Sequence, residues 1–409
     1  MLTVEEALDE ILRIVEPLAP ESRALGESLG LTLAGQVLSD VDSPPFDKAL
    51  MDGYAVRSED IREAGTELTV IEEIMAGRVP TRSLEAGQAT RIMTGAPIPD
   101  GCDAVVKVEE TESTGDTVRI LAESARSEQN LIRRGTNMKC GEVVLEAGRT
   151  LRAQELSALA EMGSHQVSVR RRPAMAVLAT GDELVPVSET PGPGQIRNSN
   201  ETMLAAQIEQ AGGAAVPLGI ARDEREHLRE RIAVGLQQDV LLLSGGVSAG
   251  KLDLVPSELA GAGVEQVFHK VRVKPGKPVW FGILKAEEGS AASPGRRNSC
   301  LVFGLPGNPV SSMVCFELFV RTAIRWLCGQ QDAKPRPISA RLAHPHTHRD
   351  DRETYFPAAV DCADGSRVTL MKWHGSSDLQ ATRDANAMAV FPAEPREYQA
   401  GDPVDVILW

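Results

Sequence analysis

The 409-residue sequence predicts a multidomain α/β protein with a doubly wound parallel-sheet domain. Apolar runs alternate with helical segments after Arg172, which is the order expected for such a sheet. The run at 240–243 has no polar alternation, as is typical of a central parallel strand covered on both faces. Ser244, Gly245 and Gly246 then end that strand. Parallel sheets bind ligands at this edge, so we expect the site there.

The first 170 residues predict two further domains. Thr3 and Glu6 form a capping box before an amphipathic helix, and a second short helix is expected within 29–38. Prolines 44 and 45 then break the pattern, and β-branched segments separated by turns predict a mostly β module over 42–140. Because helical periodicity returns at 152–162, we assign 1–41 and 141–170 to one discontinuous helical linking domain.

The remaining sequence divides into the doubly wound domain and a terminal β domain. Residues 171–331 hold the alternating strands and helices, and they end with a long helix over 309–327. Short strands and turns over 332–409 predict a small C-terminal β-barrel-like domain.

Composition and charge exclude several classes of protein. Apolar residues make up 42% of the chain and charged residues 25%, which is ordinary for a folded globular protein. The net charge of −15 argues against broad binding to nucleic acid or acidic membranes. The acidic N-terminus does not resemble a secretory signal, and the six cysteines have no metal-finger spacing. We therefore expect a cytoplasmic protein with reduced thiols, no nucleic-acid partner and no membrane partner.

Two more glycine-rich loops, 273–282 and 303–312, follow the turn at Ser244. Lys274 and Lys277 add positive charge to the first, and Asn308 is expected to cap a helix that starts at Pro309 in the second. Any one of these loops could simply connect two neighbouring elements. Three loops of this kind predict a site for an anionic ligand.

Three histidines, at positions 344, 346 and 348, would share one face of an extended segment and could in principle hold a transition metal. Pro345 favours an edge or loop, and no cysteine or acid at a fixed spacing completes a ligand set. We therefore expect these histidines to be exposed to solvent.

Six motifs in order resemble the MoeA family of molybdopterin molybdenumtransferases, which includes the E domain of gephyrin. They are MDGYAV, RIMTGAPIPDGCDAVV, ATGDELV, SGGVSAG, VKPGKP and GLPGNPVS, between residues 51 and 311. The resemblance covers nearly the whole chain. It implies that the doubly wound domain is of the molybdopterin-binding type.

The resemblance also implies a reaction and an assembly. A family member takes adenylylated molybdopterin and molybdate, releases AMP and leaves molybdenum on the pterin dithiolate, with Mg²⁺ assisting. It works as an elongated homodimer whose active cleft lies between the doubly wound domain of one chain and the β module of the other. A transient contact with molybdopterin adenylyltransferase is also expected.

Functional residues are carried over by motif position. The expected catalytic residues are Asp52, Thr94, Glu183, Asp253, Lys274 and Lys277. The expected metal ligands are Glu183, Asp223 and Asp253. The expected substrate-binding residues are Ser244, Gly245, Gly246, Ser248, Gly250, Pro275, Gly276, Gly304, Pro306, Gly307, Asn308, Pro309, Arg352 and Ser376. Carboxylates suit Mg²⁺, while lysines and the N–H groups of glycine turns offset phosphate and molybdate charge.

The chain departs from the family pattern at three positions. Asn137 and Asn198 stand where or near where the family commonly has an acid, and Lys251 replaces a frequent acid. Each change removes negative charge, which puts the number of metal-binding carboxylates in question. Purely structural roles are the alternative: Asp52 could hydrogen-bond only to the backbone of its own turn, and Asp253 could interact favourably with a helix dipole.

Two other functions are compatible with parts of the sequence. The first is a CinA-like or adenylyltransferase-like nucleotide enzyme, which shares the doubly wound domain but has no need of MDGYAV or the module at 66–144. The second is a non-catalytic molybdopterin-binding or scaffold protein. This chain lacks a second fused domain and a long linker, yet binding without turnover stays possible.

Overall fold

A computed structural model of the chain describes residues 1–247, 254–286, 299–363 and 366–409. The chain forms two compact units. Unit 1 comprises Met1–Gly35, Ala147–Arg152 and Gln166–Trp409, and unit 2 comprises Gln36–Glu146 and Ala153–His165.

Unit 1 is built on a six-stranded sheet, with four parallel strands followed by two antiparallel ones. In spatial order the strands are β17 (Ala214–Ala221), β14 (Ala174–Thr180), β18 (Val240–Ser244), β22 (Cys300–Leu305), β21 (Trp280–Leu284) and β19 (Glu265–His269). Every residue of β18 is buried, as its unbroken apolar run predicts. The doubly wound domain is confirmed, with an antiparallel edge added.

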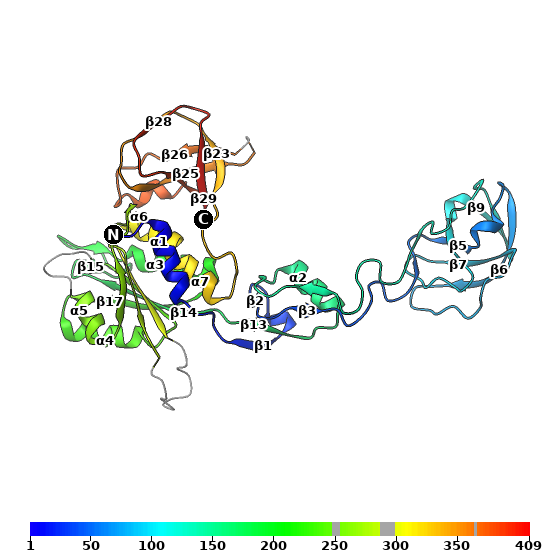
Figure 1. Cartoon of the computed structure of the whole chain (residues 1–409), viewed down its shortest axis with the longest axis horizontal. Coiled ribbons are helices and arrows are strands. Elements are labelled where there is room, and N and C mark those ends of the chain that lie inside the picture. The colour runs from blue at the N-terminus through cyan, green and yellow to red at the C-terminus, as the bar shows by residue number, and fades with distance from the viewer. Residues whose placement is uncertain (248–253, 287–298, 364–365) are drawn as a thin grey trace. The chain divides into compact units, whose positions relative to one another are not determined.

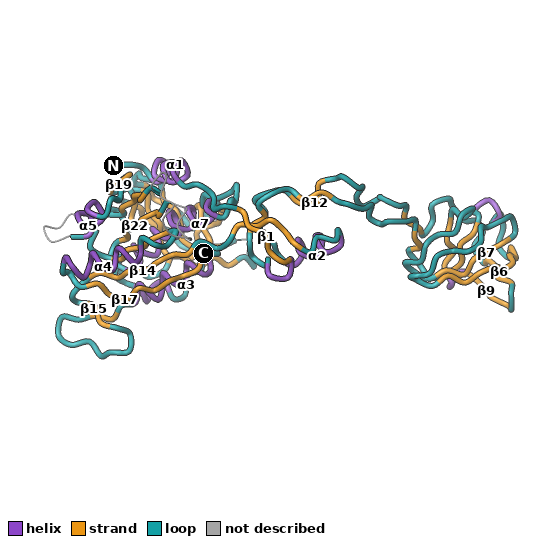
Figure 2. The backbone as a smooth tube through the Cα atoms, turned by 90° about the horizontal axis from the view of Figure 1, so that it is seen from below, coloured by secondary structure: helices purple, strands orange, loops and turns teal. Residues whose placement is uncertain are grey.

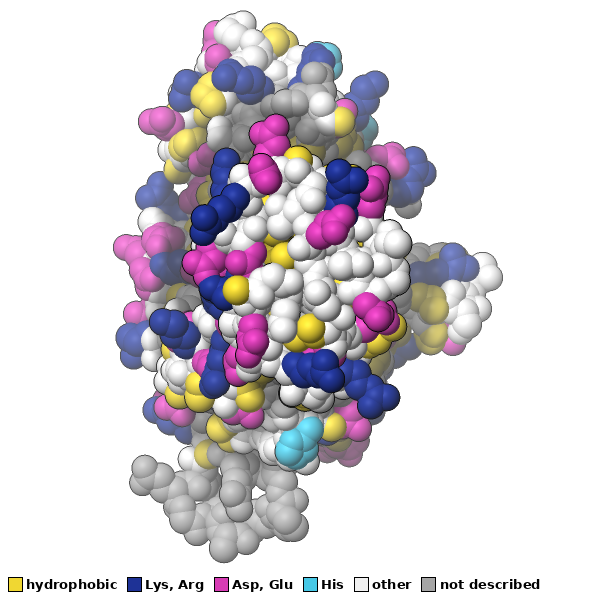
Figure 3. Space-filling model, turned by 90° about the vertical axis from the view of Figure 1, so that its right-hand side faces the viewer, with side chains coloured by type: hydrophobic (Ala, Val, Ile, Leu, Met, Phe, Trp, Pro, Cys, Tyr) yellow, Lys and Arg dark blue, Asp and Glu magenta, His cyan; other side chains and the backbone are white. Residues whose placement is uncertain are grey.

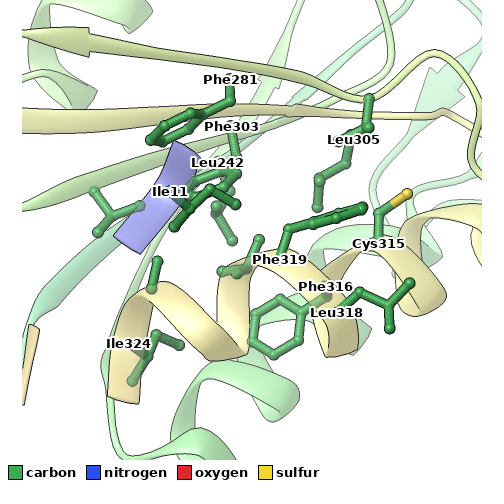
Figure 4. Close-up of a cluster of buried hydrophobic side chains, with 14 of the residues drawn as sticks. Ile11, Leu242, Phe281, Phe303, Leu305, Cys315, Phe316, Leu318, Phe319 and Ile324 are labelled. Carbon is green, nitrogen blue, oxygen red and sulfur yellow. The ribbon is translucent and has the colours of Figure 1, made fainter. Parts of the chain in front are cut away.

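Helices cover both faces of this sheet (Figure 1). On one face, Leu242 and Phe303 pack against α1 (Val4–Ile14), α3 (Ser199–Ala211) and the long helix that starts at Pro309. On the other, Leu241 and Leu243 pack against α4 (Arg225–Gly235) and α5 (Val255–Gly261). Alternate residues of one strand thus feed two separate cores. Figure 4 shows the first core, where Ile11 and Phe319 approach the sheet.

The long helix consists of α6 (Pro309–Cys315), a π-helical turn η4 (Phe316–Val320) and α7 (Arg321–Leu327). It covers the range that the sequence predicts. The π turn was not foreseen. All five of its residues are buried, including the charged Glu317.

A small antiparallel sheet of unit 1 joins the N-terminal segment to the segment before the α/β core. It pairs β1 (Pro20–Ala24) with β13 (Gln166–Arg170) and β13 with β2 (Thr32–Leu33). The helix expected within 29–38 is wrong. The segment instead forms β2 and β3 (Val37–Leu38), because pairing with distant strands overrides a weak local helical pattern.

The C-terminal part of unit 1 is a closed five-stranded barrel. Its strands are β25 (Glu353–Asp361), β26 (Arg367–Leu370), β23 (Ile338–Leu342), β29 (Pro403–Leu408) and β27 (Ala387–Phe391). Pairing of β25 with both β26 and β27 closes the ring, so no edge is left open. The short strand β20 (Val273–Lys274), from the α/β core, pairs with β25. The predicted C-terminal β-barrel-like domain is confirmed.

The expectation that the histidines near 346 are exposed is wrong for His348. His346 and His348 lie on β24 (His346–His348), which pairs with β28 (Arg396–Tyr398). His348 is only 5% exposed and stacks on Phe391 at a ring-centroid distance of 5.5 Å. His348 therefore contacts buried aromatic side chains instead of solvent, which the spacing of the histidines in the sequence did not reveal. No cluster of three metal-ligating side chains occurs in the described residues.

Unit 2 is mostly β, as expected from its short β-branched segments (Figure 2). Its main sheet contains, in spatial order, β8 (Ala104–Lys107), β5 (Gly53–Val56), β7 (Gln88–Ile92), β6 (Thr66–Ile74), β10 (Thr117–Ile120) and β9 (Thr111–Thr114). Two smaller pairs, β4 (Lys48–Ala49) with β11 (Leu131–Ile132) and β3 with β12 (Val143–Leu145), and helix α2 (Ala153–Glu161) complete it. Two apolar clusters fill the faces of the main sheet.

Acidic and basic side chains are intermixed on the face shown in Figure 3. That face is therefore not uniformly negative, although the net charge of the chain is −15. Local clusters of charged side chains decide where an anion can bind. Within the described residues, no helix combines the length and the apolar character needed to cross a bilayer.

Candidate functional site

The Ser244 turn closes tightly against the end of the neighbouring strand. Gly245 and Gly246 have φ values of +98° and +65°, which other residues rarely adopt. A Cβ on Gly245 would lie 2.7 Å from the carbonyl oxygen of Thr180, at the end of β14. Only glycine fits, so the turn stays narrow and open to a ligand at the carboxyl edge of the sheet.

The KPGKP loop, residues 274–278, connects β20 to β21 and rests on α6. A Cβ on Gly276 would lie 2.4 Å from the sulfur of Cys315 in α6. The loop therefore approaches the helix as closely as a bare backbone allows. This contact fixes the positions from which Lys274 and Lys277 extend.

Asn200 ties the first loop to the third. Its side-chain amide donates to the Ser244 hydroxyl and to the Gly307 carbonyl, both at 2.8 Å. The sequence reasoning missed this residue. The sequence feature that could have pointed to Asn200 is a polar side chain in the first turn of a helix that begins beside the expected sheet edge.

Two adjoining pockets collect most of the expected residues. The first, the sheet-edge pocket, has a volume of about 770 Å³ and is lined by Glu183, Asp223, Ser244, Gly245, Gly246, Pro306, Gly307, Asn308 and Pro309, among others. The second, the KPGKP pocket, has a volume of about 600 Å³ and includes Lys274, Pro275, Gly276, Lys277, Arg352 and Ser376. The pockets share Pro278, Pro306 and Asn308, so together they form one continuous hollow.

A small charge network organises the KPGKP pocket. The Lys274 ammonium lies 2.7 Å from one Asp350 oxygen, and Arg352 Nε lies 3.2 Å from the other. Burial alone would raise the pKa of Asp350, but the hydrogen bond from Lys274 and both cationic charges outweigh it, so the pKa is lowered. Asp350 was also missed, although it stands two residues before Arg352.

Two aromatic rings complete the same pocket. Phe356 and Trp373 meet edge to face, with ring centroids 5.0 Å apart. Phe356 comes from β25 and Trp373 from the loop between β26 and β27, and both rings line the pocket together with its cations. Such a wall lowers the local dielectric and strengthens binding of an anion by nearby lysines.

Asn308 does not cap its helix, contrary to expectation. It occupies the N-cap position of α6, but its side chain makes no capping bond. Instead its amide donates to the Ser376 hydroxyl at 2.9 Å, while the Ser376 carbonyl accepts the backbone N–H of Val310. A tertiary contact replaces the local one and attaches the barrel's loop to the start of α6.

The two described acids of the sheet-edge pocket have different surroundings. The carboxylate of Glu183 folds back over Gly181, where an added Cβ would lie 2.4 Å from one oxygen. The backbone N–H of Asp223 donates to Asp182 at 3.2 Å. Both acids supply hard oxygen donors. Mg²⁺ is usually held by one or two carboxylates plus substrate phosphates, so this donor set fits it without a cluster of three acids.

The departure at Asn198 has a structural explanation. Asn198 is the N-cap of α3, and its side-chain oxygen accepts the Glu201 N–H. Its amide donates to the Glu201 carboxylate at 2.9 Å. An aspartate here would cap the helix equally well but would place two carboxylates in contact. At a second departure, Asn137 is exposed in unit 2.

Asp52 and Thr94 lie in unit 2 and contact each other directly. One Asp52 oxygen accepts the backbone N–H of Thr94 at 2.6 Å and its hydroxyl at 2.7 Å. These hydrogen bonds lower the pKa of Asp52. The sequence motifs are 42 residues apart, yet they meet as one pair on the surface of this unit.

Some expected residues lie outside both pockets. Gly304 sits inside β22, where a Cβ would lie 2.5 Å from Val247, so its role is to allow close packing. Ser248, Gly250, Lys251 and Asp253 lie outside the described residues.

Comparison with known families accounts for almost the whole chain. Residues 2–163 match the MoeA N-terminal region (domain I and II), and residues 339–409 match the MoeA C-terminal region (domain IV). Residues 176–326 match the probable molybdopterin binding domain. The chain belongs to the MoeA family.

Full-length relatives agree with this MoeA assignment. The chain is 33% identical over 416 residues to the molybdopterin molybdenumtransferase of Staphylococcus aureus (strain COL), covering 100% of this chain and 95% of the relative. It is also 33% identical over 421 residues to the protein of that name from Staphylococcus epidermidis, with the same coverage. A crystal structure of the molybdopterin biosynthesis moeA protein from Pyrococcus horikoshii OT3 matches with a TM-score of 0.83 and 28% identity, covering 100% of both chains.

Proposed function

We propose that this MoeA-family chain inserts molybdenum from molybdate into adenylylated molybdopterin and releases AMP. One observation carries the proposal: Lys274, Lys277 and Arg352 line one pocket although they come from two separate segments of the chain. That pocket adjoins a second one lined by glycine turns and carboxylates. The hollow thus has places for both an oxyanion and a phosphate-bearing ligand.

The side chains would divide the work between the two pockets. Lys274, Lys277 and Arg352 would hold the tetrahedral oxyanion against the aromatic wall. The turn at Gly245 and Gly246 would offer backbone N–H groups to phosphate oxygens. Asp350 would keep Lys274 in place rather than touch the substrate, since it already binds that ammonium group. Holding the reactants in fixed positions is itself a large part of such catalysis.

Glu183 and Asp223 are the described side chains that would hold Mg²⁺ in the sheet-edge pocket. When bound, the ion neutralises charge on phosphate oxygens and so favours release of AMP. Asp253 is proposed as a further ligand from its motif position alone.

We further propose that the chain acts as a homodimer in the cytoplasm. A transient contact with a molybdopterin adenylyltransferase would supply the reactive, adenylylated substrate directly. Asp52 and Thr94 are proposed to act in the same reaction as the KPGKP pocket, on the basis of motif position.

Turnover can be measured directly. Purified protein is incubated with adenylylated molybdopterin, Mg²⁺ and molybdate, and AMP is quantified against a blank without protein. We expect AMP release that requires molybdate. No AMP above the blank, together with measurable binding of the pterin substrate, would instead favour a non-catalytic scaffold.

A further inference from the structure

A second basic hollow lies in unit 1, away from the proposed substrate pockets. Four arginines line it, Arg170, Arg172, Arg321 and Arg325, and its volume is about 360 Å³. Among its described lining residues the sole acid is Glu209. We call this hollow the arginine pocket. Such an excess of positive charge is unusual in a chain with a net charge of −15.

The arginine pocket is separate from the proposed reaction site. Helix α3 has Asn200 in its first turn at the sheet-edge pocket and ends at Ala211 in the arginine pocket. A helix of 13 residues spans about 20 Å. The long helix likewise runs from Pro309 at one pocket to Arg325 near the other. The arginines are therefore too far away to touch a ligand bound at Ser244.

Helix capping does not explain these arginines. Two helices end at the pocket, and cationic side chains often satisfy the free carbonyls of such ends. Here the backbone already does so, because Gly212 N–H donates to the Glu209 carbonyl and Gly213 N–H to the Ile208 carbonyl. At the end of α7, Gly329 and Gln330 donate in the same way to carbonyls of that helix.

Internal partners account for only two of the four guanidinium groups. Arg321 is held by the buried Glu317, whose carboxylate also accepts the Gln207 amide at 2.7 Å. Arg170 donates to the Leu18 carbonyl.

The other two guanidinium groups, those of Arg172 and Arg325, are held less firmly by other residues of the protein. The Arg172 guanidinium lies 3.9 Å from Glu209, beyond hydrogen-bond distance. The Arg325 guanidinium has no hydrogen-bond or salt-bridge partner within the described part of the chain. Burial and then repulsion from Arg321 lower the pKa of its guanidinium, and they outweigh the attraction of the nearby Glu317 carboxylate.

We propose that the arginine pocket binds a phosphoryl dianion, either inorganic phosphate or the phosphate group of a small metabolite. Guanidinium groups match phosphate oxygens in pairs, and Arg172 and Arg325 approach the pocket from different elements. Arg321 is kept at its edge by a buried carboxylate in a π-helical turn, a feature often found at functional sites. The hollow is larger than a phosphate ion, so a phosphate ester also fits. This proposal does not depend on the proposed reaction.

Calorimetric titration tests the proposal. The titrant is sodium phosphate at about pH 8, where phosphate is a dianion, and ionic strength is held constant. All proteins carry Lys274→Ala, which weakens anion binding in the KPGKP pocket. We expect Arg325→Gln and Arg172→Gln each to weaken phosphate binding about tenfold or more, because each removes charge-assisted hydrogen bonds. Titration with glycerol phosphate distinguishes an ester ligand, for which tighter binding than free phosphate is expected.

The matched control is Arg383→Gln. Arg383 is an exposed arginine whose guanidinium pairs with the adjacent Asp384 and with no other acid among the described residues, so this change removes the same charge from the chain at another place. Arg325→Lys should keep part of the binding, since it retains the charge without the planar fork. Thermal melts check folding, and Arg172→Gln still tests the site if Arg325→Gln fails to fold. Equal phosphate affinity in Arg172→Gln, Arg325→Gln and the control would overturn the proposal.

Discussion

Two acids, Asp350 in unit 1 and Asp52 in unit 2, are stabilised in different ways. In unit 1, Asp350 is partly buried and shares its charge with Lys274 and Arg352. In unit 2, Asp52 is exposed, and within the described residues its carboxylate accepts hydrogen bonds from Thr94 alone. Both pKa values are lowered, one chiefly by cationic partners against burial and the other by neutral donors.

This difference separates an anchoring acid from one whose charge is uncompensated. The negative charge of Asp350 is already neutralised by its neighbours, so its main effect is to position them. Asp52 keeps its full negative charge in a fixed direction, because neutral hydrogen bonds orient a carboxylate without cancelling it. We therefore expect cation removal in unit 1 and acid removal in unit 2 to affect the reaction by different routes.

The largest effect is expected for Lys274→Ala. Loss of one preorganised charge that stabilises an oxyanion typically lowers turnover about a hundredfold or more. AMP release measures the loss, and substrate binding should weaken more at low salt than at high salt. Lys285→Ala is the matched control, since Lys285 is also exposed and paired, with Glu265. A salt-independent loss would contradict an electrostatic role.

The next test asks whether the two units act in one reaction across a homodimer. Asp52→Ala and Lys274→Ala proteins, each inactive alone, are mixed in equal amounts under conditions that allow subunit exchange. If each reaction centre uses Asp52 of one chain and Lys274 of the other, up to about a quarter of the centres become intact. Exchange demonstrated by mass spectrometry with no regained AMP release would rule out this shared use.

A smaller change, with a distinct kinetic signature, is expected for Asp350→Asn. Without the carboxylate, Lys274 is less well fixed but carries more uncompensated charge. We expect kcat to fall about tenfold and KM to fall as well, because ground-state binding of the anion improves while alignment worsens. Asp350→Glu should recover part of kcat. A rise in KM with unchanged kcat would mean that Asp350 does not position the lysine.

The smallest effect concerns acid stability, which should differ between the units. Burial lowers the pKa values of His346 and His348 below 6.5, so the unfolded chain takes up protons first as pH falls. Their contribution to the stability of unit 1 is therefore complete above about pH 6.5 and is lost as the pH falls below it. Unit 2 has a single histidine, His165, and should be less sensitive.

Hydrogen exchange at about pH 7.5 and pH 5.5 can follow each unit separately. His348→Phe should reduce the acid sensitivity of unit 1, since a phenyl ring can stack on Phe391 without titrating. The loss of Nε2 should cost little, because Nε2 is buried and makes no hydrogen bond within the described residues. An unchanged pH dependence in this variant would exclude His348 as the cause.

Local patterns in the sequence were enough to predict the doubly wound domain and the C-terminal barrel, and they place the candidate site at the edge of the sheet. The apolar run of β18, the glycines after it and the lysines of the KPGKP loop each report their own surroundings through short-range sterics and solvation. Strand ends of one parallel sheet meet at one edge, so the convergence of the loops followed as well.

Tertiary structure alone decided which side chains bind one another. Asn308 donates to Ser376 in place of the expected helix cap, and His348 is buried against Phe391. Asp350 and Asn200 contact residues that lie far away in the sequence. The four arginines of the arginine pocket likewise come from separate segments. Periodicity and motif spacing describe neighbours along the chain. Contacts between distant segments depend on how whole domains pack. Burial then determines which partner each hydrogen-bonding or charged side chain has.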